Sequence, residues 1–326
     1  MAIGAGIGAS LGVATESTFG TGVTVTRFYE FNSENLAFRK KTAEGMGLRA
    51  GGQLPRSQRR VVTTKDAGGD LDLDLPTRGL GLLLSYAMGT TPTATTVSAG
   101  SVYSYTFTLG DTFGKSFTTQ VGVPQYGGTV TPKTLAGCKV NNFEISVANG
   151  EIAKGKFGID AQSLTTATSL STVSYPANGS VFNFAQGAIT LNGSAVANIK
   201  DFTVTVDNAI KNDRYNLGAL GLKAEQNISG FRKVSGKITA EFTDTVLLAA
   251  FLADTTASLA LTFTGDTIAS TYKDTLSITL PACKFDADTP NVSGPGVVDL
   301  AMSFTVYDNG TDAPMTVFYQ TSESAL

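Results

Sequence analysis

Residues 69–75 have the sequence GDLDLDL, in which a leucine alternates with an aspartate at every second position. Alternation with a period of two is typical of a β-strand that has one buried and one solvated face. A second stretch, GKITAEF at 236–242, alternates in the same way in the second half of the chain. We therefore expect two similar strands, one in each half of the chain.

Further matches between the two halves follow in the same order along the chain. Each alternating stretch precedes a segment rich in leucine and alanine, at 80–87 and 247–251, that favours a short helix. Two more pairs of segments match, namely GLRA at 47–50 with GLKA at 221–224, and GCKV at 137–140 with ACKF at 282–285. Their shared order indicates a duplicated domain. Two unrelated β-domains with similar glycine-punctuated strands are the alternative.

The composition agrees with an all-β fold that carries a short helix in each of two tandem β-sandwich or barrel domains. The 326 residues are 42% hydrophobic and only 16% charged, which is enough for two cores of about 100 to 150 residues each. We predict five segments: an N-terminal arm (1–24) that needs a neighbour to order it, a first domain (25–162), a linker (163–180), a second domain (181–320) and a C-terminal tail (321–326).

Several classes of function are disfavoured by the residues that the chain lacks. It contains no His, the commonest general base and zinc ligand, and no Trp. The formal charge of −3 argues against a protein that grips nucleic-acid phosphates. Cys138 and Cys283 are expected to be buried free thiols. No apolar stretch approaches the length of a membrane span. We predict no enzyme activity, no catalytic or metal-binding residues and no cofactor.

The chain resembles the tail tube, or major tail, proteins of siphophages. The resemblance lies in the glycine-rich opening through VATESTFGT (13–21), in GKSFTTQVG (114–122), and in GCKV (137–140) with the hairpin that continues to Lys154. This hairpin is expected to turn at Asn149-Gly150, a strong hairpin signal. The resemblance implies two packed antiparallel sheets flanked by a helix. It also implies rings that stack into a hollow tube for DNA passage, each ring closed by joining four-stranded sheets into one inner barrel, which removes exposed sheet edges.

With two such domains per chain, the resemblance implies trimeric rings with pseudo-six-fold symmetry. The alternative is a hexamer in which one domain forms the barrel and the other decorates its outside. The implied partners are further copies of the chain, tape measure protein and genomic DNA in the lumen, and tail terminator and distal tail proteins at the tube ends. The implied location is the virion tail, after synthesis in the cytoplasm of the bacterial host.

Acidic side chains are the candidates for lining the lumen, where they would repel DNA phosphates. Asp70, Asp72 and Asp74 share one strand face because they alternate with leucines. The full candidate set is Asp70, Asp72, Asp74, Glu144, Glu151, Asp160 and Glu241. An ordinary solvated outer face is the alternative.

Arg56, Arg59 and Arg60 form a basic cluster in a long loop. We expect either a contact between rings or subunits or a solvated loop. Two other functions stay open. The chain could be a decorating or adhesin-like phage β-protein, or a carbohydrate-active enzyme that uses the paired carboxylates of Asp72 and Asp74.

Overall fold

The computed structural model describes residues 5–98, 100–177, 179–243, 245–287, 289–292 and 294–326. Its elements are mostly β-strands, with two short α-helices, α1 (Gly81–Met88) and α2 (Val246–Leu252), at the two leucine-rich segments. The prediction of an all-β fold with short helices is therefore confirmed. No helix among the described residues is long and apolar enough to cross a membrane.

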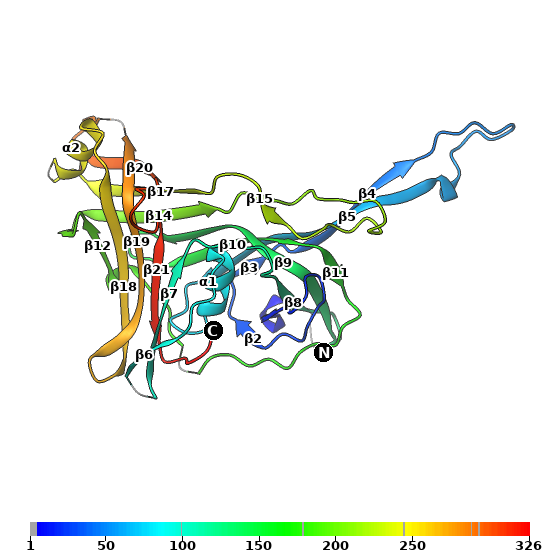
Figure 1. The fold of residues 1–326 in the computed structure, drawn as a ribbon, viewed down its shortest axis with the longest axis horizontal. Coiled ribbons are helices and arrows are strands. Elements are labelled where there is room, and N and C mark those ends of the chain that lie inside the picture. The colour runs from blue at the N-terminus through cyan, green and yellow to red at the C-terminus, as the bar shows by residue number, and fades with distance from the viewer. Residues whose placement is uncertain (1–4, 99, 178, 244, 288, 293) are drawn as a thin grey trace.

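One antiparallel sheet runs through both halves of the chain (Figure 1). From one edge to the other, its strands lie in the order β4 (Ala37–Glu44), β5 (Arg60–Asp74), β10 (Lys154–Ala161), β9 (Val130–Val147), β14 (Ile199–Asp207), β17 (Lys233–Glu241), β20 (Asp299–Val306) and β19 (Tyr272–Ala287). The short β3 (Ser33–Glu34) also pairs with β5. We call these strands the main sheet.

The remaining strands form the outer layers of the two halves. In the first half they are β1 (Ser10–Thr15), β2 (Arg27–Tyr29), β8 (Phe117–Pro124) and β11 (Ser163–Thr165). Against the second half lie β18 (Ala257–Ala269), β12 (Gly187–Leu191), β13 (Ser194–Val196) and β21 (Thr316–Thr321), joined by β7 (Val102–Thr108) and β6 (Thr95–Ser98) from the first half of the chain. A separate hairpin pairs β15 (Ile210–Lys211) with β16 (Asn227–Ile228).

The alternating stretches 69–75 and 236–242 lie at corresponding places in the main sheet. The ladder between β5 and β10 sets Gly69 opposite Ile159, and the ladder between β17 and β20 sets Gly236 opposite Phe304. The stretch 69–75 therefore pairs with β10 in the same register as the stretch 236–242 pairs with β20. The hairpin predicted at Asn149-Gly150 is also present, between β9 and β10.

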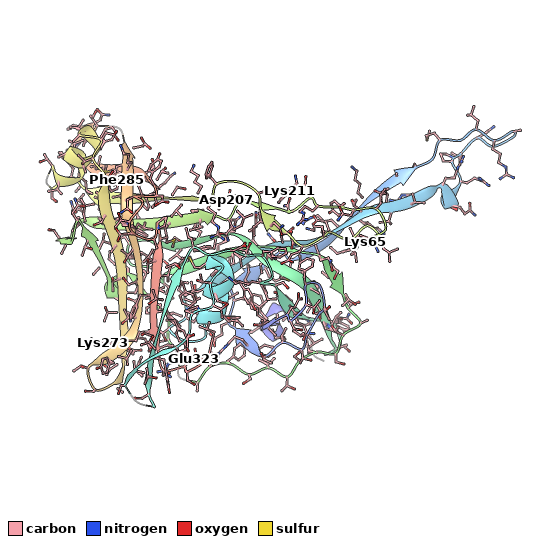
Figure 2. The ribbon with its side chains drawn as sticks, viewed as in Figure 1. Lys65, Asp207, Lys211, Lys273, Phe285 and Glu323 are labelled. Carbon is pink, nitrogen blue, oxygen red and sulfur yellow. The ribbon has the colours of Figure 1, made fainter. Side chains whose placement is uncertain are left out.

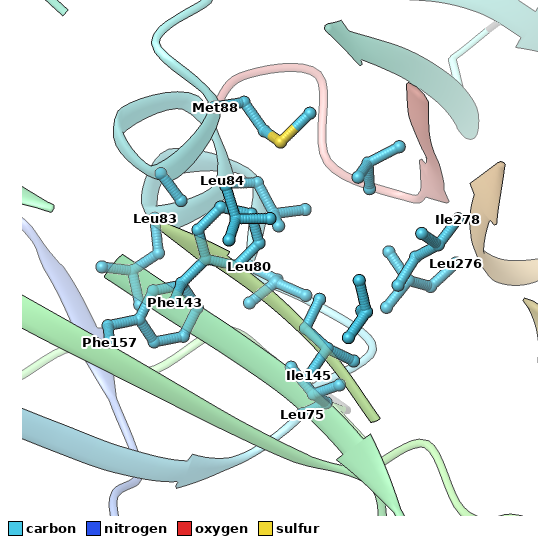
Figure 3. Packing of buried hydrophobic residues seen from close by; sticks show 14 of the residues in the cluster. Leu75, Leu80, Leu83, Leu84, Met88, Phe143, Ile145, Phe157, Leu276 and Ile278 are labelled. Atoms are coloured by element: carbon cyan, nitrogen blue, oxygen red, sulfur yellow. The ribbon is translucent and has the colours of Figure 1, made fainter. Parts of the chain in front are cut away.

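A single hydrophobic cluster fills the space between the layers. Helix α1 is buried along its whole length, and Leu80, Leu83 and Leu84 lie close to Phe143 and Phe157 of the main sheet (Figure 3). The helix ends at Gly89, whose φ of 74° is the left-handed conformation that closes a helix without the penalty of a side chain. Because buried residues of both halves belong to this cluster, the halves share one core.

Strands or hydrogen bonds are present in the predicted arm, linker and tail. The N-terminal arm contains β1, which is buried and pairs with β2 on one side and β8 on the other. The predicted linker contributes β11 to a sheet of the first half. The C-terminal tail is held by Glu323, whose carboxylate accepts hydrogen bonds from Arg27 and from the backbone N–H of Gly79.

Candidate assembly surface

The main sheet consists of two four-stranded units that meet at β9 and β14. The first unit has the order β4–β5–β10–β9, and the second has the order β14–β17–β20–β19. The two units join through antiparallel pairs that run from Phe202 opposite Val147 to Asp207 opposite Asn142. We call this β9–β14 pairing the internal joint. Backbone hydrogen bonds thus make the two units continuous within one chain.

Asn208 fastens the end of the internal joint. Its backbone N–H donates to the carbonyl of Asn141 at 2.8 Å. Its fully buried side-chain amide donates to the carbonyls of Ala87 and Val140, both at 2.9 Å. The second unit is therefore tied both to β9 and to the C-terminal end of helix α1.

The two outer edges of the main sheet differ in charge. Among the described strands, β4 pairs only with β5, and its exposed residues include Arg39, Lys40 and Lys41. At the opposite edge, the C-terminal end of β19 pairs with β20 on one side and presents the exposed carboxylate of Asp286. Lysines on an edge strand discourage nonspecific strand pairing. They can still pair with carboxylates on a partner edge.

Asp70, Asp72 and Asp74 do lie together on one face of β5, opposite a face of buried leucines. The three carboxylates have different partners. Asp70 lies 3.4 Å from the ammonium of Lys156, Asp72 accepts from the hydroxyl of Ser33 at 3.0 Å, and Asp74 accepts from the amide of Asn32 at 2.8 Å. They form a partly exposed polar surface, which we call the polar face.

The polar face continues across both units of the sheet. Strand register places Glu144 of β9 on it, opposite Lys156 on one side and Thr205 on the other. Glu241 of β17 lies opposite Asp299 of β20, and the ammonium of Lys200 contacts both carboxylates at 3.2 and 2.8 Å. The surface therefore mixes acidic side chains with lysines instead of being uniformly acidic. Glu151 is exposed in the β9–β10 turn, beyond the strands.

Asp160 does not belong to the exposed part of the polar face. Its carboxylate is buried and contacts the ammonium of Lys223 at 2.5 Å and the side-chain amide of Gln226 at 2.7 Å. Burial raises the pKa of Asp160 above its usual range, against the opposing effect of Lys223. Burial alone would lower the pKa of Lys223, but the carboxylates of Asp160 and Asp66 raise it. We therefore leave Asp160 out of the candidate lumen residues.

The partners of Asp160 come from residues 208–232, which connect β14 to β17 and which we call the β14–β17 loop. This loop packs on the first half of the chain (Figure 2). The buried ammonium of Lys139 contacts Glu225 of the loop at 2.6 Å, and the backbone N–H of Lys65 donates to the carbonyl of Gly221 at 2.8 Å. Sequence reasoning did not assign these contacts, although the GLKA match at 221–224 marked the segment.

Arg56, Arg59 and Arg60 lie at the corresponding connection of the first unit, residues 45–59 between β4 and β5, and at the start of β5. We call this connection the β4–β5 loop. It projects from the rest of the molecule (Figure 1), and all three arginines are exposed. Arg60 lies 3.5 Å from Glu44 of the same hairpin. Among the described residues, the recorded contacts of these arginines lie within the same hairpin.

Neither of the two cysteines forms a disulfide. Cys138 and Cys283 are free and fully buried, as predicted, and burial raises the pKa of the Cys283 thiol to about 12. Among the residues that the structure describes, no group of three or more His, Cys, Asp or Glu side chains could hold a metal ion. Asp72 and Asp74 are bound to neighbouring polar side chains within the sheet.

A family model described as phage tail tube protein matches residues 6–306, which is nearly the whole chain. None of the curated proteins matches.

Proposed function

The chain belongs to the phage tail tube protein family, and we propose on this basis that three copies of it close into a ring. The rings stack into the tube of a siphophage tail, through which the genome passes into the host cell. As in the family, the role is structural, and we assign no catalytic residue. The single observation that carries the proposal is the internal joint, where two four-stranded units of the same order already form one continuous sheet.

Ring closure repeats the internal joint between chains. A second chain would set its β4 against the free end of β19, as β14 lies against β9 within one chain. The basic residues Arg39, Lys40 and Lys41 on β4 then face the acidic edge at Asp286. A head-to-tail contact of this kind closes on itself when the rotation between units is right. Three chains would supply six units and leave no sheet edge exposed.

The internal joint favours a trimer over a hexamer with one decorating domain per chain. A decorating second unit would lie outside the barrel, away from the sheet of the first unit. Instead, β14 continues the sheet of β9 without interruption, and the two units share one hydrophobic cluster. This supports a duplicated domain with both copies in the barrel wall.

In such a ring, we propose that the polar face lines the lumen. Its candidate acidic residues are Asp70, Asp72, Asp74, Glu144 and Glu241, with Glu151 at the rim. Interleaved lysines such as Lys156 reduce the net charge, so DNA would meet a surface that neither binds it strongly nor repels it at long range. Tape measure protein would occupy the lumen before the genome does. Tail terminator and distal tail proteins would cap the two ends.

The corresponding location is the virion tail, after synthesis in the cytoplasm of the bacterial host. A decorating or adhesin-like role would need no second chain at the β4 edge, so the behaviour of that edge separates the alternatives.

Replacing Phe38 with proline tests ring closure. The N–H of Asn35 donates to Asp70 of β5, and strand alternation then directs the N–H of Phe38 toward the free edge. Proline removes that donor and blocks strand pairing. The control, Phe38→Ala, keeps the backbone N–H and also removes the phenyl side chain. We expect Phe38→Pro to remain a folded monomer by sedimentation, while the natural chain and Phe38→Ala form trimers or tubes. Normal assembly of Phe38→Pro would refute closure through β4.

A further inference from the structure

The two hairpin connections of the main sheet correspond in sequence and length but differ in their surroundings. Lys40 corresponds by register to Asn208, and Lys65 corresponds to Arg232, so the stretches 40–65 and 208–232 differ in length by one residue. The β14–β17 loop packs on the first half of its own chain, and its Lys223 is 1% exposed. The β4–β5 loop leaves Met46 and Leu48 exposed, the latter completely.

The surface that would correspond to the docking site of the β14–β17 loop is uncovered in the second half. Within the chain, that site includes the end of α1, where Asn208 binds the carbonyl of Ala87. Helix α2 ends in the same way as α1: the N–H of Thr255 donates to Ala250, as that of Thr90 donates to Ser85.

These matching helix ends make Leu252 of α2 the counterpart of Ala87. Leu252 is 66% exposed, and Leu247 is the only described residue of α2 that is buried, whereas all of α1 is buried. The counterpart of the occupied site is thus an exposed, partly apolar helix end.

We propose that the β4–β5 loop of one chain docks on this second-half surface of a neighbouring chain, as the β14–β17 loop docks on the first half within one chain. The inference rests on the proposed ring and adds the side-chain contacts of its subunit interface. The occupant is a second copy of this chain, because the internal joint supplies the occupied counterpart of the contact.

Charge complementarity supports the placement of Lys40 at the end of α2. Lys40 would reach the C-terminal end of the neighbour's α2, where a helix dipole attracts a cation. The carboxylate of Asp254 lies at the same helix end with its side chain 76% exposed, and at present contacts only the surface ammonium of Lys284 among the ion pairs of the described residues.

The contact between chains would differ from the internal contact in the residues that correspond to its buried ion pairs. Arg49 corresponds to Lys223 through the GLRA and GLKA match. Lys284 lies opposite Thr305 as Lys139 lies opposite Asp160, so Thr305 takes the place of the buried carboxylate.

The docked β4–β5 loop therefore lacks the buried ion pair that fixes the β14–β17 loop. Its attachment relies on Lys40 at the helix end and on burial of Met46 and Leu48. Surface charge pairs are screened by salt, so docking should weaken as salt concentration rises.

Cysteine cross-linking between chains tests the inference. One variant carries Lys40→Cys and Leu252→Cys, and a second carries Arg49→Cys and Thr305→Cys. The native thiols are buried and give little background. The control pairs Lys40→Cys with Tyr272→Cys, which lies at the opposite end of β19, near Lys273 in Figure 2. Assembled protein is treated with a short bismaleimide and analysed on a denaturing gel.

We expect covalent dimers and trimers in at least ten-fold excess over the control for both designed pairs, and only in the assembled protein. Trimeric rings in which neither pair cross-links above the control would overturn the docking inference and leave the ring intact. Rings in which position 40 cross-links to position 252, but position 49 does not cross-link to position 305, would overturn docking of the β4–β5 loop. They would still place the end of β4 beside α2. Absence of any ring would instead contradict the proposed function on which the inference rests.

Discussion

At the scale of single residues, the buried charges mark where the chain is fastened to itself. Glu16 is 4% exposed, and its carboxylate accepts from Ser116 at 2.7 Å, Thr118 at 2.9 Å and the backbone N–H of Gly137 at 2.8 Å. These bonds satisfy a carboxylate that would otherwise be costly to bury. They attach the end of β1 to the first half of the chain, in a segment whose glycine-rich sequence predicted an arm ordered by a neighbour.

Lys223 and Arg49 offer a matched pair of substitutions. Lys223→Met removes the buried ammonium and leaves the carboxylate of Asp160 buried without its cationic partner. Breaking a buried ion pair in this way lowers the free energy of unfolding by about 3 kcal/mol. Arg49→Met alters an exposed side chain, so its free energy of unfolding should change by less than about 0.5 kcal/mol. Urea denaturation of the monomer measures both. Equal effects of the two substitutions would show that the loops are not differently docked in the free chain.

Asp274 should make stability depend on pH in an unusual direction. Its side chain is 2% exposed, and burial raises its pKa to about 6, although Arg78 lies 3.8 Å away and acts in the opposite direction. The pKa of Asp274 is higher in the folded protein than in the unfolded chain. Its contribution to stability is therefore fully present below about pH 4 and is lost as pH rises through about 6.

Asp274→Asn should therefore gain stability relative to the natural chain as pH rises from about 4 to 7, by roughly 2 kcal/mol. Thermal or urea unfolding of both proteins across this range measures the difference, and every other group cancels. A difference that is constant with pH, or that changes in the opposite direction, would show that Asp274 is charged in the folded protein without penalty.

At the scale of elements, the sequence predicted what local periodicity controls. The alternation at 69–75 and 236–242 identified two corresponding strands, and the leucine-rich segments identified both helices. The Asn149-Gly150 turn identified the β9–β10 hairpin. Each of these features is set by side-chain spacing within one segment, which is visible in a single sequence.

Pairings between distant segments were not predictable in the same way. The insertion of β1 between β2 and β8, and the pairing of β21 with β7, join residues far apart in the chain. Their strands lack a pattern that specifies a partner. Asp160 illustrates the consequence for the candidate site: its strand position was compatible with an exposed face, but a loop some 60 residues later covers it.

At the scale of the whole molecule, the chain contains one joint between its two units and presents the two halves of a second. The internal joint shows that units with this strand order pair edge to edge. The β4 edge and the end of β19 are the unpaired counterparts among the described strands, and β4 is the more basic of the two. A free subunit with complementary ends can stay soluble through its edge lysines and still assemble when correctly oriented.

Electron cryomicroscopy of the assembled protein tests ring closure most directly, by resolving the strands of the barrel wall. We predict three chains in each ring, with β4 of one chain paired to the end of β19 of the next and the backbone N–H of Lys40 directed to the carbonyl of Asp286. This is the arrangement that Asn208 and Asn141 have at the internal joint. Six chains in a ring, with the second unit outside the barrel wall, would contradict the account.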